Sequence, residues 1–245
     1  MIISDDTILG GRIRLRQARG GYRAGLDAAL LAAACDPAAA NRLLDVGCGV
    51  GAVMLAAAAR RPGVSFTGLE RDPDAAMLAR ENIGLNGFEG QVTVVEGDAA
   101  DPFARLGLAP FDAVVSNPPF FDDASALRGP APAKESAWIA PEGLAAWLAF
   151  LSKATREGGS ITVIHRADRL ADLLAGLSPK AGSFQIRPIH PFADVPAKRV
   201  LVRAIKTGKA PLRLLPPLVL HERDGAKHRP EVEAILRGEA DLDWR

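Results

Sequence analysis

Residues 43–61 of this 245-residue chain, LLDVGCGVGAVMLAAAARR, decide its fold. They begin as a short apolar strand, Leu43–Gly47, pass through a run of glycines and continue as a helix, Val53–Arg61, that ends at Pro62. Glycines at such a turn let the backbone approach a ligand closely, and the helix N-terminus that follows favours an anionic group. The stretch predicts a strand–turn–helix unit with a nucleotide-type cofactor at the turn, and a tight structural turn without a ligand is the alternative.

Strands and helices alternate in the same way along the rest of the chain. Six further core strands are predicted, at residues 64–70, 91–96, 111–116, 160–165, 184–189 and 200–205. Further helices are predicted at residues 26–35, 73–86, 142–156 and 169–177, and a separate arginine-bearing strand at 12–16. This alternation indicates an α/β fold of βαβ units around a mostly parallel sheet. In such a sheet the ligand lies beyond the carboxyl ends of the strands, where the unusual residue clusters of this chain fall.

Composition limits the class of protein and its compartment. Apolar residues make up 48% of the chain, enough for a sizeable core. The two cysteines, Cys35 and Cys48, are too few for a disulfide framework and fit a reducing cytoplasm. The sequence shows no signal-peptide pattern and no uncharged apolar run of about 18 residues, so we expect a cytoplasmic protein with no membrane contact. The four histidines are scattered, and we predict no metal site.

Charge is spread unevenly although the net charge is only +1. Residues 1–25 carry five arginines against two aspartates, which gives +3, and residues 198–229 carry nine basic groups against two acidic ones, which gives +7. The last sixteen residues, 230–245, carry five acidic groups and two arginines, which gives −3. Two basic segments on a nearly neutral chain predict one basic face that contacts RNA, and an ordinary solvated surface is the alternative.

Acidic residues follow three successive predicted strands. Asp45, Glu70 and Asp98 stand at these strand ends, where a single acid would usually cap a helix. A carboxylate in the position of Glu70 can accept from both ribose hydroxyls of an adenosine, and Asp98 can accept from its adenine amino group. No lysine stands at the glycine turn, which excludes a Walker-type phosphate loop. Together the three acids indicate an adenosine site that does not require a phosphate.

The glycine turn and these acids resemble the class I S-adenosylmethionine-dependent methyltransferases. The resemblance implies a Rossmann-like fold with a seven-stranded, mostly parallel sheet, helices on both faces and an antiparallel last strand. It implies S-adenosylmethionine as the cofactor, with Glu70 on its ribose and Asp98 on its adenine. The residues that we expect to hold the cofactor are Asp27, Asp45, Gly47, Gly49, Gly51, Glu70, Arg71, Asp98, Ala99 and Asn117.

Residues 117–120, NPPF, follow the strand at 111–116 and predict the chemistry. The two prolines stiffen the segment, so the Asn117 side-chain oxygen and the Pro118 carbonyl can face the two N–H groups of one amine. Phe120 can stack on a planar substrate. A proline-stiffened turn is the alternative, but the segment resembles the N-P-P-[FYW] signature of enzymes that methylate planar nitrogens. Asn117, Pro118 and Phe120 are therefore the expected catalytic residues.

The opening segment, residues 17–27, is similar to the start of the bacterial valine-tRNA adenine-N6 methyltransferases, which act on position 37 in the anticodon loop. The similarity continues through NPPF, Lys198-Arg199-Val200 and the segment from Leu218 onward, and it places Asp27 over the cofactor. It implies adenine-N6 methylation of a tRNA; guanine N2 in RNA or a protein glutamine amide is the alternative substrate. A separate DNA-recognition domain is not seen, and a helical domain ahead of the fold, usual in glutamine methyltransferases, is not seen either.

We expect one methyltransferase domain over residues 1–245, with an N-terminal strand and capping helix (1–40), a core (41–206) and a C-terminal extension (207–245). It is expected to act as a monomer or a homodimer. The expected RNA contacts are Arg12, Arg14, Arg16, Lys198, Arg199, Lys206 and Lys209. Residues 122–136 fit either a substrate lid or a solvated connector. A nicotinamide-dependent oxidoreductase is disfavoured because NPPF has no role there, and a cofactor-binding protein without catalysis is disfavoured by Asn117.

Overall fold

The structure, a computed structural model, describes residues 2–19, 25–35, 41–119, 141–224 and 226–244. Its centre is a sheet in the order β10-β8-β9-β7-β6-β3-β4-β5, with β11 beside β8. The strands are β3 (Arg42–Val46), β4 (Ser65–Glu70), β5 (Val92–Glu96), β6 (Phe111–Ser116), β7 (Thr155–Arg166), β8 (Ala181–His190), β9 (Arg199–Lys206), β10 (Arg213–Leu214) and β11 (Leu218–Val219).

The direction of the strands confirms the predicted Rossmann-like sheet. Strands β3 to β7 pair in parallel, and β9, the last of the seven core strands, is antiparallel to both β7 and β8. The seven core strands match the predicted ones in number and order along the chain. The two-residue strands β10 and β11 add to them beside β8, and were not predicted because two residues carry no periodicity.

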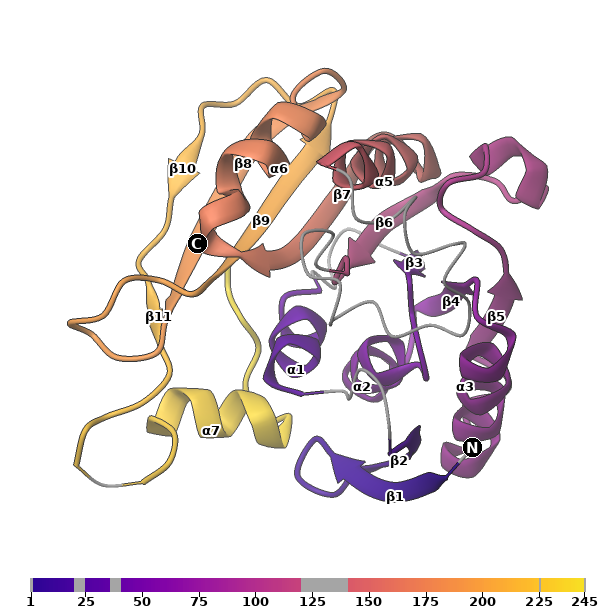
Figure 1. The fold of residues 1–245 in the computed structure, drawn as a ribbon, viewed down its shortest axis with the longest axis horizontal. Helices are drawn as coiled ribbons and strands as arrows, with labels where there is room; N and C mark the ends of the chain where they lie inside the picture. Colours follow the sequence, from indigo (N-terminus) through magenta and orange to yellow (C-terminus); the bar gives the residue numbers. More distant parts are fainter. Residues whose placement is uncertain (1, 20–24, 36–40, 120–140, 225, 245) are drawn as a thin grey trace.

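Helices cover both faces of the sheet, as predicted (Figure 1). They are α1 (Leu26–Ala33), α2 (Ala52–Arg60), α3 (Pro73–Asn86), α5 (Pro141–Ala154), α6 (Leu170–Leu177) and α7 (Pro230–Arg237), with short 3-10 helices η2 (Phe103–Leu106) and η3 (Ala167–Arg169). Successive strand residues point to opposite faces: Leu43 joins the hydrophobic cluster of α1 and α2, whereas Leu44 joins that of α5 and α6. The predicted helix 142–156 is shorter, because Thr155 already pairs with Phe111 at the start of β7.

The N-terminal strands β1 (Ile3–Ile8) and β2 (Ile13–Ala18) form a separate antiparallel hairpin. Two asparagines of α3 fix β2 through its backbone: Asn86 binds Arg14, and Asn82 binds Arg16 at 2.8 and 3.0 Å. Arg12 donates to the Ala59 carbonyl near the end of α2, at 3.3 Å. Strand β2 therefore runs from the amino edge of the sheet toward its carboxyl edge. β2 was predicted at 12–16, whereas β1 was not foreseen.

The C-terminal extension returns along the sheet and then crosses the helices. Beyond β9 the chain runs beside β8 through β10 and β11, and α7 then packs near α1 (Figure 1). The Trp244 indole donates to the Ala34 carbonyl at 2.8 Å, and Arg60 donates to the Ala240 carbonyl at 2.7 Å. These contacts tie the chain end to α1 and α2. Within the described ranges, no helix is both long and apolar enough to cross a membrane.

Candidate active site

Strand register brings the predicted site segments to one edge of the sheet. Val46, the last residue of β3, pairs with Leu69 on one side and with Ser116 on the other. The glycine turn therefore starts between Glu70, which ends β4, and Asn117, which follows β6. Because these parallel strands all end at this carboxyl edge, the structure places the two predicted motifs side by side.

The glycine turn adopts a backbone that side chains disfavour. Gly47, Gly49 and Gly51 have φ values of 73°, 55° and 89°, in the left-handed region. A Cβ on Gly47 would lie 2.9 Å from a ring carbon of Trp147, whereas a Cβ on Gly49 would meet nothing within 4 Å. The Trp147 ring packed beneath Gly47 therefore requires a glycine there. The space beside Gly49 is open, so a ligand can approach the backbone at this residue.

Glu70 fixes the shape of this turn. One carboxylate oxygen accepts from the Gly49 backbone N–H at 2.8 Å, and the other accepts from the N–H groups of Arg71 and Asp72 at 2.9 Å each. The carboxylate is only partly buried. Each carboxylate oxygen has two lone pairs, and these backbone groups use three of the four, so Glu70 keeps one acceptor position for a ribose hydroxyl. The prediction that Glu70 lies at the glycine turn agrees with this geometry.

Asp45 lies beneath the turn as a buried acid without a counter-charge. Its residue is 1% exposed, and one of its oxygens has no hydrogen-bond partner among the described residues. Burial, with the nearby charge of Glu70, raises the pKa of Asp45 to about 7, against a smaller opposing effect of the Met54 backbone N–H. No salt bridge joins Asp45 or Glu70 to a basic side chain in the described part. Two carboxyl groups in this state fit a cationic ligand, and the expected cofactor carries both a sulfonium and an ammonium group.

Asp98 and its neighbours form the next part of this edge. The Asp98 carboxylate accepts from the Ala100 backbone N–H at 2.9 Å, and the Arg71 guanidinium lies 3.7 Å from its other oxygen. Ala99 is buried beside it. The side chain of Asp98 stays 31% exposed, so the carboxylate is anchored and still accessible. Glu70, Arg71 and Asp98 therefore lie together, as the sequence predicted.

A buried pair of side chains supports the Asn117 corner from below, and sequence reasoning missed it. The Trp147 indole N–H donates to the Ser116 hydroxyl at 2.9 Å, and that hydroxyl donates to the Val46 carbonyl at 2.8 Å. Ser116 precedes Asn117 and Val46 precedes Gly47, so this chain of hydrogen bonds links both motifs. The sequence gives only a weak signal for this pair, namely that a serine, Ser116, ends an otherwise mostly apolar strand.

The corner itself is partly described. Asn117 is half-buried and Pro118 is buried, directly beyond the end of β6. Phe120 and the segment 122–136 lie outside the described residues, so the predictions for them stay predictions.

Asp27 and Arg199 meet in an ion pair. The Arg199 Nε donates to the Asp27 carboxylate at 2.9 Å, with the Asp27 side chain 17% exposed. Asp27 was expected over the cofactor and Arg199 on RNA. In the structure the pair joins α1 to the start of β9 at the carboxyl edge, and the expected roles of both residues stay predictions.

The predicted RNA contacts divide between the two edges of the sheet. Arg12 and Lys206 belong to the amino edge, where Lys206 donates to the Thr155 carbonyl at 2.8 Å. Arg16, at the carboxyl end of β2, pairs with Asp5 and Glu81 at 3.3 and 3.4 Å. Arg12 and Lys206 therefore lie at the edge opposite to the glycine turn, and the single basic face that contacts RNA stays a prediction.

Comparison with known proteins gives consistent matches. Residues 23–129 match the family model described as methyltransferase small domain. A tRNA1(Val) (adenine(37)-N6)-methyltransferase from Trichodesmium erythraeum is 30% identical over 213 residues, covering 81% of this chain and 83% of the relative. An enzyme of the same name from Aeromonas salmonicida is 37% identical over about half of each chain, 46% of this one and 47% of the relative. A crystal structure from Agrobacterium tumefaciens, described as a predicted O-methyltransferase, gives a TM-score of 0.74 at 29% identity, covering 88% and 98%.

Proposed function

The chain belongs to the family of S-adenosylmethionine-dependent methyltransferases that these relatives represent, and from this premise we propose that it methylates adenine N6 at position 37 of a valine tRNA. One observation carries the proposal: the glycine turn with its two uncompensated carboxyl groups stands beside the Asn117-Pro118 corner at one sheet edge. The substrate is the one named for the relatives, which cover most of the chain.

The cofactor would be held by the residues around the glycine turn. When bound, it supplies an electrophilic methyl group on a sulfonium. Gly47, Gly49 and Gly51 give it access to the backbone, and the remaining acceptor position of Glu70 accepts from a ribose hydroxyl. Asp98 accepts from its adenine amino group, with Arg71 and Ala99 beside it. Asp45 adds negative potential beneath the turn, and Asp27 shapes the site through α1 and its pair with Arg199.

Asn117 and Pro118 would orient the amine that is methylated. An aromatic amine delocalises its lone pair into the ring and is a weak nucleophile. Two fixed acceptors, the Asn117 side-chain oxygen and the Pro118 carbonyl, stabilise the positive charge that develops on nitrogen during attack. They also align the nitrogen for displacement at the methyl carbon, and Phe120 stacks on the base.

Contact with tRNA is proposed for the basic groups at the carboxyl edge. Arg16 and Lys198 lie there, whereas Arg12 and Lys206 lie at the far edge. We place the enzyme in the cytoplasm with its substrate. We treat residues 1–245 as one domain, since the C-terminal extension is tied to the core helices through Arg60 and Trp244.

The direct test is to identify the product. The purified protein is incubated with labelled S-adenosylmethionine and an unmodified valine tRNA transcript, and the RNA is digested and analysed by nucleoside mass spectrometry. N6-methyladenosine mapped to position 37 is the expected result. A transcript with guanine at position 37 is the matched control and should accept no label.

Other products would redirect the proposal. N2-methylguanosine would keep the chemistry and change the base. Label on protein with none on RNA would contradict the tRNA assignment and favour a glutamine amide.

A further inference from the structure

An aromatic pocket lies at the carboxyl edge, away from the candidate active site. Phe192 follows β8 by two residues and His221 follows β11 by two, and the His221 backbone N–H donates to the Pro191 carbonyl at 2.9 Å. Strand β8 runs parallel to β7 and β6, so these residues share the edge that carries Asn117. Three strand spacings separate β8 from β6 in the sheet, which is about 14 Å.

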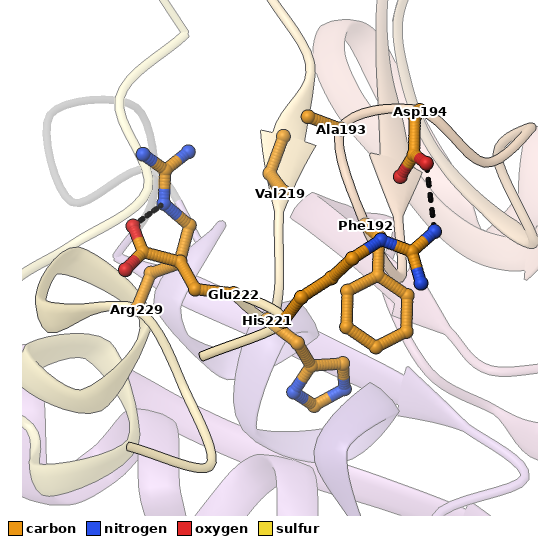
Figure 2. Close-up of a pocket in the computed structure, with 8 residues that line it drawn as sticks. Phe192, Ala193, Asp194, Val219, His221, Glu222 and Arg229 are labelled. Carbon is orange, nitrogen blue, oxygen red and sulfur yellow. Dashed lines mark hydrogen bonds and ion pairs between the residues drawn. The ribbon is translucent and has the colours of Figure 1, made fainter. Parts of the chain in front are cut away.

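The pocket has an aromatic wall. Its volume is about 320 Å³, and it is lined by Phe192, Ala193, Asp194, Val219, His221, Glu222, Arg223 and Arg229. The Phe192 and His221 rings are neighbours, with their centroids 5.6 Å apart (Figure 2). His221 also stacks on His228, with their centroids 5.0 Å apart. Burial, with the charges of His221 and Lys227, lowers the pKa of His228, so the inner ring stays neutral. The wall therefore presents two neighbouring aromatic rings, tilted by 48° to each other.

Cationic groups stand at the rim of the pocket. The Arg223 guanidinium lies 5.1 Å from the Phe192 ring centroid, within cation–π range. Arg223 pairs with Asp194 at 2.7 Å and Arg229 pairs with Glu222 at 3.2 Å (Figure 2). The Arg223–Asp194 pair is more than 60% exposed on both sides, so solvent screens it and it is easily exchanged for a phosphate. Arg223, Arg229 and Glu222 belong to the segment 198–229, which has a charge of +7. Phe192 and Asp194 come just before that segment.

The chemistry of the wall and rim selects the ligand. A phenylalanine placed for core packing would be buried, whereas Phe192 is half-buried in a loop with its ring in the pocket. Flat rings beside guanidinium groups stack unpaired bases and neutralise the neighbouring phosphates. We propose that this pocket holds an unpaired nucleobase of the RNA substrate, a few nucleotides from the adenine that is methylated. The inference rests on the proposed function for the identity of that RNA.

The test compares three substitutions of one residue. Phe192→Ala removes the ring, Phe192→Leu keeps apolar volume without a flat face, and Phe192→Tyr restores the face. Binding of unmodified valine tRNA is measured by fluorescence anisotropy with S-adenosylhomocysteine present. The alanine and leucine variants should bind roughly 5- to 50-fold more weakly, and the tyrosine variant within about twofold of wild type.

Two controls separate the possible failures. S-adenosylhomocysteine binding should be unchanged in all three variants, which shows that they are folded. Lys180→Ala, an exposed lysine just before β8 at the opposite edge of the sheet from the pocket, should weaken binding little. Alanine and leucine variants that bind tRNA as tightly as wild type would overturn the assignment of the pocket. The proposed function would be unaffected by that result if the wild-type protein methylates tRNA. A wild-type protein that neither binds nor methylates RNA would instead overturn the proposed function.

Discussion

Two clusters of buried charge lie at opposite ends of helix α2, and they are built in opposite ways. Ahead of the helix, Asp45 and Glu70 are both acidic and no basic side chain of the described residues pairs with them. At its end, Arg60 and Arg61 share Asp241 at 3.1 and 2.9 Å, and Arg60 also donates to the Ile235 carbonyl. The Arg60 side chain is only 3% exposed.

The difference separates folding from function. Opposite charges at the end of α2 hold the C-terminal extension against the helix, because each partner offsets the desolvation of the other. The two acidic groups at the start of α2 do not stabilise the folded chain, because their charges repel each other. A ligand of opposite charge would compensate them. The first cluster should therefore govern binding and the second should govern stability.

The largest expected effect concerns the pH dependence of stability at Asp45. Its pKa rises from 3.8 in the unfolded chain to about 7 in the folded protein. Between these values the folded protein holds a proton that the unfolded chain has released, so stability falls as the pH rises and levels off above about pH 7. From about pH 4.5 to pH 8 the loss is about 3 kcal/mol of the free energy of unfolding. Urea denaturation at several pH values measures it.

Asp45→Asn is the control for this loss, because the amide does not titrate. The stability of the variant relative to wild type should increase steadily from acid to neutral pH. Stability curves of the two proteins that stay parallel would show that Asp45 is not an uncompensated buried acid.

Breaking the other cluster should cost stability and leave binding intact. Arg60→Met removes the guanidinium that donates to the Ala240 and Ile235 carbonyls and removes one of the two partners of Asp241. We expect a loss of about 2–3 kcal/mol in the free energy of unfolding, less than for a fully buried pair because Asp241 is half-exposed. Urea denaturation and calorimetric binding of S-adenosylhomocysteine at a temperature where the variant is folded give both quantities.

Arg237→Met supplies the matched control, since Arg237 pairs with Glu233 on the exposed face of α7. It should leave the free energy of unfolding almost unchanged, because solvent screens an exposed ion pair. An Arg60→Met protein with normal stability but weakened cofactor binding would contradict the proposal that the Arg60 cluster governs stability and not binding.

Glu70→Gln should weaken the cofactor site and also loosen the glycine turn, because both carboxylate oxygens accept backbone N–H groups and an amide nitrogen cannot. The amide keeps the volume of the side chain but loses one acceptor and the negative charge that face the glycine turn. We expect S-adenosylhomocysteine to bind about tenfold more weakly by titration calorimetry, which corresponds to about 1.4 kcal/mol. Glu96→Gln, at the end of the neighbouring strand and paired with Arg80, should bind normally. Equal affinities for the two variants would contradict the ribose role of Glu70.

The smallest expected effect lies in the hydrogen bonds beneath the Asn117 corner. Trp147→Phe keeps the ring against Gly47 but removes the donor to Ser116. A hydrogen bond of this kind contributes about 1 kcal/mol, so we expect kcat to fall roughly three- to tenfold with the KM for cofactor unchanged.

Trp244→Phe makes the same chemical change in the C-terminal extension, which we assign to stability. There the Trp244 indole donates to the Ala34 carbonyl. It should lower stability by about 1 kcal/mol and leave kcat unchanged. Identical kinetics for the two tryptophan variants would show that Trp147 does not position the corner.

Local signals in the sequence predicted most of the fold. Asp72 accepts from the N–H groups of Asp74 and Ala75, and Gly87 ends α3 with a φ of 72°, so this helix has the predicted bounds, 73–86. The site was predicted as far as it depends on strand ends, because parallel strands must meet at one edge. The contacts that were not predicted join residues far apart in the chain. Trp147 and Ser116 are 31 positions apart, and Asp27 and Arg199 are 172 positions apart. Neither contact leaves a periodic or local pattern.

The central claim is that Asn117 acts on the amine that is methylated, and that any contact it makes with the cofactor contributes little to cofactor affinity. The measurement that tests it most directly is the single-turnover rate of methyl transfer to valine tRNA by Asn117→Ala, with S-adenosylhomocysteine affinity measured alongside. We predict a rate at least about 100-fold below wild type, because one of two fixed acceptors for the developing charge is lost, and an affinity within about twofold. A rate within threefold of wild type, with cofactor still bound, would contradict the assignment of the Asn117 corner as the place of reaction.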